Sequence, residues 1–241
     1  MKAKSSLGEL YDLQGPSAMA ATVLECRNVT KSFLIRGATV QALSDISMSV
    51  SQGEFVVVTG RSGVGKSTLL SILSGIERLD SGEVFFDGQP LATASNQELA
   101  SLRRHSFGIV FQALNLLPAW TAFENVESSL LFIGVPKDER RDRVMQWLGR
   151  VGLAERADHL PGELSVGEQQ RVAVARALIA DPAVLLADEP TCAVDPETGR
   201  EILKLLLHEA RAKSKTLLLA THGAVPPEAD RMLRLDAGRL E

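Results

Sequence analysis

The stretch GRSGVGKST at residues 60–68 has the residue types of a phosphate-binding loop. It fits the pattern G-x-x-x-x-G-K-[ST], and it lies between an apolar run, EFVVVTG, and a helix-like segment, KSTLLSILSGI. The glycines allow backbone N–H groups to surround a β-phosphate, the lysine supplies charge for the β- and γ-phosphates, and the first hydroxyl suits Mg²⁺. The predicted nucleotide-binding residues here are Gly60, Arg61, Ser62, Gly63, Val64, Gly65, Lys66, Ser67 and Thr68.

The segment VLLADEP supplies two adjacent carboxylates after a second apolar run. Asp188 ends this run, which is the usual place for the carboxylate that holds Mg²⁺ through water. Glu189 follows, and we expect its side chain to point the other way along the strand and to act as general base for an attacking water. The alternative is that both carboxylates belong to a solvated strand end.

Three further residues are expected at the same site because each follows or lies within an apolar strand pattern. Gln112 follows FGIVF, where it can contact the metal ion and the water and report the nucleotide state to the segment after it. His222 follows TLLLAT and can donate to the γ-phosphate. Phe33 can stack on adenine, although a core position is the alternative. The chain lacks the N-K-x-D or T-K-x-D element that reads guanine, which favours ATP.

A second anion site is predicted in LSVGEQQRVAVARAL, residues 164–178. Ser165 and Glu168 form a capping box, which by itself requires no ligand. That alternative leaves Gly167 unexplained, since glycine lowers helix propensity. A helix N-terminus with a hydroxyl and small residues favours an anion, and here it lies away from the first phosphate loop in sequence. The simplest arrangement is a two-fold dimer in which each phosphate loop faces the other chain's Ser165, Gly167 and Glu168.

The elements that would position these residues alternate between strands and helices. TVLECRNV, DISMSV and GEVFFDGQ predict an early antiparallel layer, and EFVVVTG, FGIVFQ, AVLLADEP and TLLLATH predict buried strands. RMLRLDAGRL predicts a closing strand and hairpin. We therefore expect an α/β fold: a P-loop NTPase core with a mostly parallel sheet, an antiparallel β layer and a helical subdomain. The predicted organisation is a flexible tail at 1–20 and one domain at 21–241, with its core at about 21–112 and 181–241 and helical residues at about 113–180.

Composition restricts the class of protein. Hydrophobic residues make up 45% of the chain, enough for a real core. The net charge of −4 disfavours nucleic acid as a partner, since nucleic-acid-binding domains carry a basic excess. No apolar run approaches the roughly 20 residues that span a bilayer, and the N-terminal residues lack the apolar region of a signal peptide. We expect a cytoplasmic protein.

Together these motifs resemble the nucleotide-binding domain of ATP-binding cassette (ABC) transporters from about residue 22 onward. In the family's terms, the Walker A motif is Gly60–Thr68, the Q-loop holds Gln112, the signature is LSVGEQQR, and the Walker B motif is Val184–Asp188 followed by Glu189. The D-loop is CAVD, and the switch histidine is His222. The resemblance implies ATP hydrolysis, with Mg²⁺, in a head-to-tail dimer that drives a membrane-embedded partner.

Three positions depart from the family pattern. The signature usually has glycine where this chain has Val166, whose β-branched side chain is expected to crowd the γ-phosphate. Gly223 stands where an acidic residue is common after the switch histidine. Phe33 replaces the more usual tyrosine and keeps the stacking face.

The segments FQALNLLPAWTAFENV, TKSF and DERRDRVMQWLGRVGL resemble the branch with lipoprotein-releasing, macrolide-exporting and cell-division ATPases. That resemblance implies a permease whose coupling helix enters a groove near residues 112–130, and hence a peripheral location on the inner face of the membrane. Trp120 and Phe123 are candidates for the groove or for the core of the insertion. Trp147 is expected in the core, and Arg140, Arg141 and Arg143 on a solvated helix face.

Two other functions compete with a transporter ATPase. A soluble cassette ATPase acting on DNA or ribosomes would usually carry a long coiled-coil insertion or two cassettes, whereas this chain has a short insertion and one Walker A motif. An ATP-gated regulator of cell-wall or division machinery is compatible with Val166, but Glu189 and His222 favour active hydrolysis.

Overall fold

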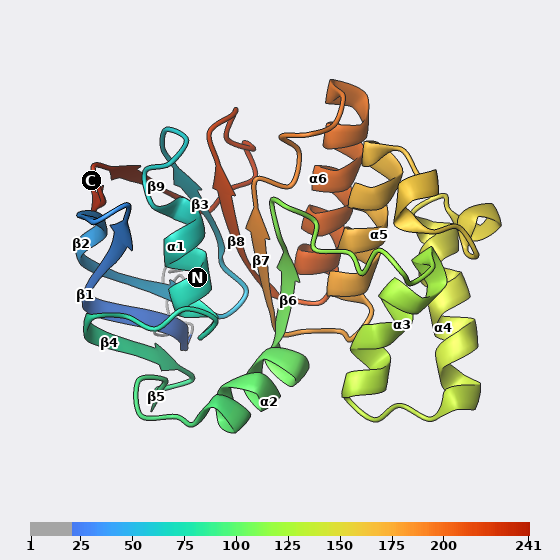
Figure 1. Cartoon of the computed structure of the whole chain (residues 1–241), viewed down its shortest axis with the longest axis horizontal. Helices are drawn as coiled ribbons and strands as arrows, with labels where there is room; N and C mark the ends of the chain where they lie inside the picture. The colour runs from blue at the N-terminus through green and yellow to red at the C-terminus, as the bar shows by residue number, and fades with distance from the viewer. Residues whose placement is uncertain (1–20) are drawn as a thin grey trace, which may run out of the picture.

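The computed structural model describes residues 21–241, and the flexible tail predicted for residues 1–20 lies outside that range. Two sheets and a group of helices form the fold (Figure 1). The predicted α/β class is confirmed, with the antiparallel layer, the mostly parallel sheet and the helical part all present.

The antiparallel sheet has the strand order β2-β1-β4-β5. Two long strands form most of it and are joined by the turn at Arg36 and Gly37. A turn at Asp87-Gly88 joins its last two strands. The strands of this sheet are β1 (Thr22–Ile35), β2 (Ala38–Ser51), β4 (Ser81–Phe86) and β5 (Gln89–Pro90).

The second sheet has the order β10-β9-β3-β8-β7-β6, with every neighbouring pair parallel except the terminal hairpin β9–β10. Its central strands are buried on both faces, as their continuous apolar runs predict. The strands are β3 (Phe55–Thr59), β6 (Phe107–Val110), β7 (Val184–Asp188), β8 (Thr216–Thr221), β9 (Arg231–Asp236) and β10 (Arg239–Leu240).

Helices cover both faces of this second sheet (Figure 1). α1 packs with the antiparallel sheet on one face, and α5 and α6 pack on the other. The helices are α1 (Lys66–Leu73), α2 (Asn96–Ser106), α3 (Ala122–Phe132), α4 (Lys137–Arg150), α5 (Val166–Leu178) and α6 (Pro196–Ala212), with 3₁₀ turns at Ala154–Arg156 and Pro161–Glu163.

Side-chain caps start most of these helices. Ser95, Thr121 and Ser165 each form a capping box with a glutamate three residues later, and the Asp195 carboxylate accepts hydrogen bonds from two N–H groups of α6. A cap of this kind contributes about 1 kcal/mol to helix stability. The predicted box at Ser165 is confirmed.

Two hydrophobic cores lie on the two faces of the parallel sheet. Alternate residues of one strand enter different cores: Val57 joins the core with α3–α6, and Val56 and Val58 join the core with α1 and the antiparallel sheet. Trp147 is buried in the first core, as predicted.

The arginines of α4 correct one expectation. Arg140 pairs with Glu127 at 2.8 Å, and Arg143 donates to the carbonyl oxygen of Ile179 at 3.1 Å. Both are half-buried, and only Arg141 matches the predicted solvated face. The reason is that α4 packs against α3 and the end of α5, which the helical periodicity of α4 alone does not reveal. No helix among residues 21–241 has the length and apolar character needed to span a bilayer.

A close approach between β6 and α5 gives a stability prediction. A Cβ on Gly108 would collide with the carbonyl oxygen of Ala177 and lie 2.7 Å from Pro182 Cγ. Because a backbone carbonyl cannot move aside cheaply, Gly108→Ala should lower the free energy of unfolding by about 1–3 kcal/mol in urea denaturation.

Gly149→Ala is the matched control. Apart from its chain neighbours and the backbone of its own helix, no described atom lies within 4 Å of the added Cβ at this position of α4. The variant should be as stable as the parent or up to about 1 kcal/mol more stable, because alanine favours helix. Equal effects of the two substitutions would contradict the steric explanation.

Candidate active site

The loop between β3 and α1 is shaped to receive an anion. Gly63 and Gly65 have φ values of 77° and 112°, a left-handed conformation that glycine adopts without steric cost. A Cβ on Gly65 would also collide with the carbonyl oxygen of Ala42. In the described chain α1 begins without a side-chain cap, unlike α5, so its first N–H groups are available to a ligand.

A buried carboxylate connects this loop to two other segments. Lys66 Nζ lies 3.1 Å from Glu189 Oε1 and donates to the carbonyl oxygens of Gly60 (2.8 Å) and Arg61 (3.0 Å). The other Glu189 oxygen lies 2.8 Å from His222 Nδ1 and accepts from the His222 backbone N–H at 3.2 Å. Lys66 and Glu189 are both almost fully buried. The three predicted site residues Lys66, Glu189 and His222 thus form one linked group.

Strand register explains this convergence. Thr59 at the end of β3 pairs with Thr221 at the end of β8, and Asp188 at the end of β7 pairs with Ala220. Because the three strands run parallel, the loops that follow them leave from the same edge of the sheet.

The expected direction of the Glu189 side chain is wrong. We expected strand alternation to send it away from Asp188, but Glu189 lies past the end of β7 with φ of 47°. Alternation does not apply to this left-handed residue, and its carboxylate turns toward Lys66. The Glu189 charge also acts on Asp188, where it raises the pKa.

Asp188 has the surroundings of a cation ligand. Its Oδ1 atom is buried with no hydrogen-bond partner among residues 21–241. Burial raises the pKa of the Asp188 carboxyl most, and Glu189 adds to the rise, while a hydrogen bond from Ser67 and the charge of Lys66 oppose it. A cation beside this carboxylate would favour its ionised form and satisfy the orphaned oxygen.

The donor set fits a hard divalent ion. Asp188 and Ser67 offer oxygen atoms, and Gln112 lines the same cavity as Ser67. The described residues contain no group of three or more His, Cys, Asp or Glu side chains that is placed to hold a metal ion. An ion held here would therefore rely on one carboxylate together with the ligand's own phosphates, which is the usual manner of Mg²⁺.

A cavity of about 520 Å³ brings most of the predicted residues together. Phe33 forms part of its wall, and Lys31 Nζ lies 5.0 Å from the centre of the Phe33 ring. The predicted residues that line it are Phe33, Ser62, Gly63, Val64, Gly65, Lys66, Ser67, Thr68, Gln112, Glu189 and His222. Gly60 and Arg61 line an adjoining cavity of about 400 Å³ together with Ser62 and His222.

Sequence reasoning missed six residues of this wall, two of which are Gln41 and Ala42 of β2. Ile35 and Val40 come from the β1–β2 hairpin, and Ala237 and Gly238 come from the turn between β9 and β10. The only sequence signal for Ile35 and Val40 is two apolar residues beside a turn at Arg36-Gly37. The link from Lys66 through Glu189 to His222 was also missed, because it joins three distant segments.

The second predicted anion site lies apart from the cavity. Ser165 accepts a hydrogen bond from the Glu168 backbone N–H at 3.2 Å, and the Glu168 carboxylate accepts from the Ser165 N–H at 2.8 Å. These hydrogen bonds lower the pKa of the Glu168 carboxyl. The residues of 21–241 that line the 520 Å³ cavity do not include Ser165, Gly167 or Glu168.

Gly167 has no steric requirement within this chain. Its φ is not in the left-handed range, and a Cβ there would meet Thr198 at 3.4 Å, an ordinary contact. Neither packing nor backbone geometry among the described residues explains a glycine in the first turn of α5.

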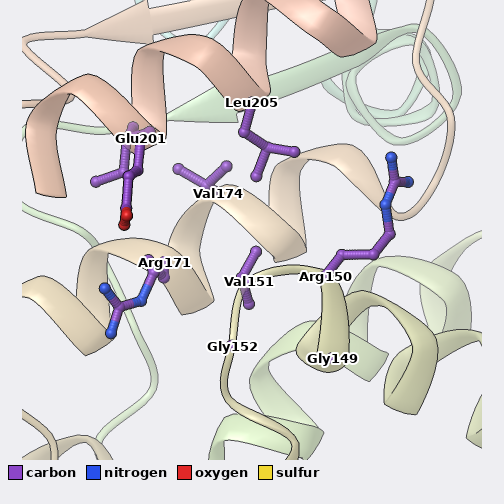
Figure 2. A pocket seen from close by; sticks show the side chains of 9 residues that line it. Gly149, Arg150, Val151, Gly152, Arg171, Val174, Glu201 and Leu205 are labelled. Carbon is purple, nitrogen blue, oxygen red and sulfur yellow. The ribbon is translucent and has the colours of Figure 1, made fainter.

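A separate hollow of about 460 Å³ lies between the end of α4, α5 and α6 (Figure 2). Arg171 and Glu201 lie at one end, Arg150 at the other, and Val151 and Val174 between them. The predicted nucleotide-binding residues do not line this hollow.

Neither Trp120 nor Phe123, the two candidates for the groove, lines the hollow beside the Gln112 loop. A hollow of about 220 Å³ beside the Gln112 loop is lined by residues of α2, β6, α3 and α5, including Asn115, Ser129 and Phe132. Phe123 packs against the first core instead, with Arg141 6.0 Å from its ring centre. The core alternative therefore applies to Phe123.

Comparisons with known proteins agree on the family. The family described as ABC transporter matches residues 43–192. An ABC transporter ATP-binding protein of Thermotoga maritima is 44% identical over 222 residues, which are 91% of this chain and 94% of that protein.

Two further relatives are named for transport. The macrolide export ATP-binding/permease protein MacB of Rhodopseudomonas palustris is 43% identical over 221 residues, which cover 91% of this chain but 34% of that protein. The methionine import ATP-binding protein MetN of Rhizobium johnstonii is 45% identical over 231 residues, which cover 95% of this chain and 62% of that protein.

Solved structures give the same result. The ATP-binding cassette MJ0796, in a dimeric post-hydrolysis state bound to ADP and Pi, superposes with a TM-score of 0.86 at 38% identity. The match covers 90% of this chain and 96% of that chain. CbiO1 of Clostridium perfringens, part of an ABC transporter complex, matches with a TM-score of 0.77 at 33% identity. This chain therefore belongs to the ABC transporter family, as one of its ATP-binding and ATP-hydrolysing domains.

Proposed function

We propose that this protein hydrolyses ATP between two copies of itself and thereby drives a membrane-embedded permease. One observation carries the proposal: the chain has two helix N-termini prepared for an anion, at Lys66 and at Ser165, and only the first opens onto the cavity with the catalytic groups. In the proposed dimer, a second copy of the chain brings the N-terminus of its α5 to this cavity. The dimeric cassette MJ0796 supports this arrangement.

The residues of the cavity then have separate roles. The backbone of the phosphate loop and Lys66 bind the β- and γ-phosphates, and Phe33 stacks on adenine, with Lys31 behind the ring. Glu189 accepts the proton of the attacking water, which is worth about 10²–10⁴ in rate. His222, held by Glu189, is positioned to detect the γ-phosphate.

Mg²⁺ is the proposed metal ion. Ser67, Asp188 and Gln112 would hold it, directly or through water, and it would neutralise developing charge on the phosphates. The orphaned Oδ1 atom of Asp188 and the hydroxyl beside it are the structural support for this assignment.

The second copy contributes Ser165, Gly167 and Glu168 to the proposed site. Ser165 uses its oxygen as an acceptor for the Glu168 N–H, so its hydroxyl proton remains available to a phosphate oxygen. Gly167 keeps the first turn of α5 free of a side chain, which allows close approach of a ligand or another chain. This explains a glycine that the contacts within one chain do not require.

The proposed permease docks beside the Gln112 loop, near residues 112–130, which places this protein at the inner face of the membrane. The wall of the 220 Å³ hollow combines apolar residues with arginines of α2 and α5, and together with the exposed ring of Phe132 it suits an inserted amphipathic helix. The resemblance to the macrolide-export branch favours export. MetN, which is named as an importer, is equally similar to this chain. We therefore propose that the permease sets the direction of transport.

Glu189→Gln tests the shared site. Without a general base the variant should bind ATP and Mg²⁺, lose about 10²–10⁴ of its turnover, and accumulate as a dimer in light scattering. Glu139→Gln, an exposed carboxylate of α4, should remain active and show no trapped dimer. A Glu189→Gln protein that binds ATP yet stays monomeric would refute the sandwich.

Val166→Gly tests the unusual signature residue. Val166 is 48% exposed at the first turn of α5, so its removal leaves the fold intact and clears space beside Ser165. Steady-state turnover should be unchanged or higher. A large fall would mean that valine contributes to the interface rather than crowding it.

Phe132→Asp tests the docking groove. Phe132 is 56% exposed, so a charged residue there should abolish co-purification with the permease from membranes and leave the basal ATPase rate unchanged. Met232→Asp, at a 58% exposed apolar residue of β9 outside this groove, is the control and should retain the permease. If both variants retained the permease equally, the permease would not dock in the hollow beside the Gln112 loop.

A further inference from the structure

The loop that carries Gln112 is held in an unfavourable backbone conformation. Leu114 and Asn115, two and three residues after Gln112, both have left-handed backbone angles, with φ of 59° and 50°. Residues with a Cβ rarely adopt this conformation, and two in succession need support from the surrounding structure. The same loop places Gln112 in the wall of the nucleotide cavity.

A single arginine of α5 supplies that support. Arg176 donates from Nη1 to the carbonyl oxygen of Asn115 and from Nη2 to that of Leu114, each at 2.6 Å. Two parallel bonds from a planar guanidinium fix both the position and the orientation of the two peptide groups. Arg176 therefore clamps the two strained residues.

The charge of Arg176 has no competing partner. No Asp or Glu among residues 21–241 lies within ion-pair distance of its guanidinium, whereas the buried lysines Lys31, Lys66 and Lys215 each pair with a carboxylate. Burial lowers the pKa of Arg176, which is the expected direction for a cation removed from water without a carboxylate. The carbonyl oxygens of the Gln112 loop are the hydrogen-bond partners of Nη1 and Nη2 of Arg176. The guanidinium therefore holds this loop and no carboxylate.

The clamp joins the Gln112 loop to the helix that begins after Ser165. Ser165 caps α5 and Arg176 lies in its last turn, so about 16 Å of continuous helix separate them. The Ser129 hydroxyl also donates to the Arg176 carbonyl oxygen at 2.8 Å, which attaches this end of α5 to α3.

We propose that Arg176 is a positioning residue for hydrolysis: by clamping Leu114 and Asn115 it holds Gln112 at the nucleotide cavity and ties its position to that of α5. The proposal rests on the role proposed above for Gln112. Arg176 itself touches neither nucleotide nor metal, and it lines the 220 Å³ hollow rather than the nucleotide cavity.

Turnover and ATP affinity separate this role from binding. Arg176→Lys keeps the charge, but one ammonium cannot reproduce the two-pronged contact, so kcat should fall about tenfold while KM and the Kd for ATP change less than about twofold. Arg143→Lys is the matched control, because Arg143 also donates to a backbone carbonyl at the end of α5 but does not contact the loop. Its kcat should be unchanged. Parental kcat in Arg176→Lys would overturn the proposal.

A double-mutant cycle tests whether Arg176 acts through Gln112. If it does, Arg176→Lys combined with Gln112→Ala should turn over no more slowly than Gln112→Ala alone. Losses that multiply would show that Arg176 acts by another route and would overturn the proposal.

Amide hydrogen exchange distinguishes failure of the clamp from failure of the role proposed for Gln112. Residues 113–117 should exchange at least about tenfold faster in Arg176→Lys than in the parent, while β7 exchanges at an unchanged rate and shows that the fold is intact. Normal turnover by Gln112→Ala would refute the role of Gln112, whatever the exchange shows. Unchanged exchange at residues 113–117 would refute the clamp.

Discussion

Parallel pairing of β3, β8 and β7 is the constraint on which the site depends. These strands align Thr59 with Thr221 and Asp188 with Ala220, so the loops after all three leave one edge of the sheet. The phosphate loop, the acidic pair and His222 therefore meet without any direct sequence signal between them. Apolar side chains on both faces of each strand fix this register by burial in two cores.

Glu189 links the groups that meet at this edge of the sheet through charge interactions. A buried carboxylate is costly unless it is paired and hydrogen-bonded, and Glu189 has Lys66 on one oxygen and His222 on the other. In the proposed mechanism Lys66 also binds the β- and γ-phosphates, so the nucleotide and Glu189 would share this cation. The same carboxylate holds His222 at the wall of the cavity through the ring Nδ1 atom and the backbone N–H.

The proposed dimer and the proposed clamp share α5. Its first turn offers Ser165 to a phosphate of the other copy, and its last turn holds the Gln112 loop through Arg176. A rigid helix of this length would make a movement at one end felt at the other, beside the hollow proposed for the permease. Because both of its ends are used, α5 is the element through which ATP binding and permease docking would influence each other.

Short-range features of the site could be predicted from the sequence. Glycines of the phosphate loop, the capping box at Ser165 and Glu168, and the apolar runs of β3, β7 and β8 each depend on residues a few positions apart, so local pattern and propensity reveal them. The α/β class follows from their alternation. Only the tertiary structure decided the left-handed backbone of Glu189, the pairing of Lys66 with that carboxylate and the hold of Arg176 on the Gln112 loop. Each of these joins segments distant in sequence, and their geometry is set by strand register and helix packing, which no local pattern contains.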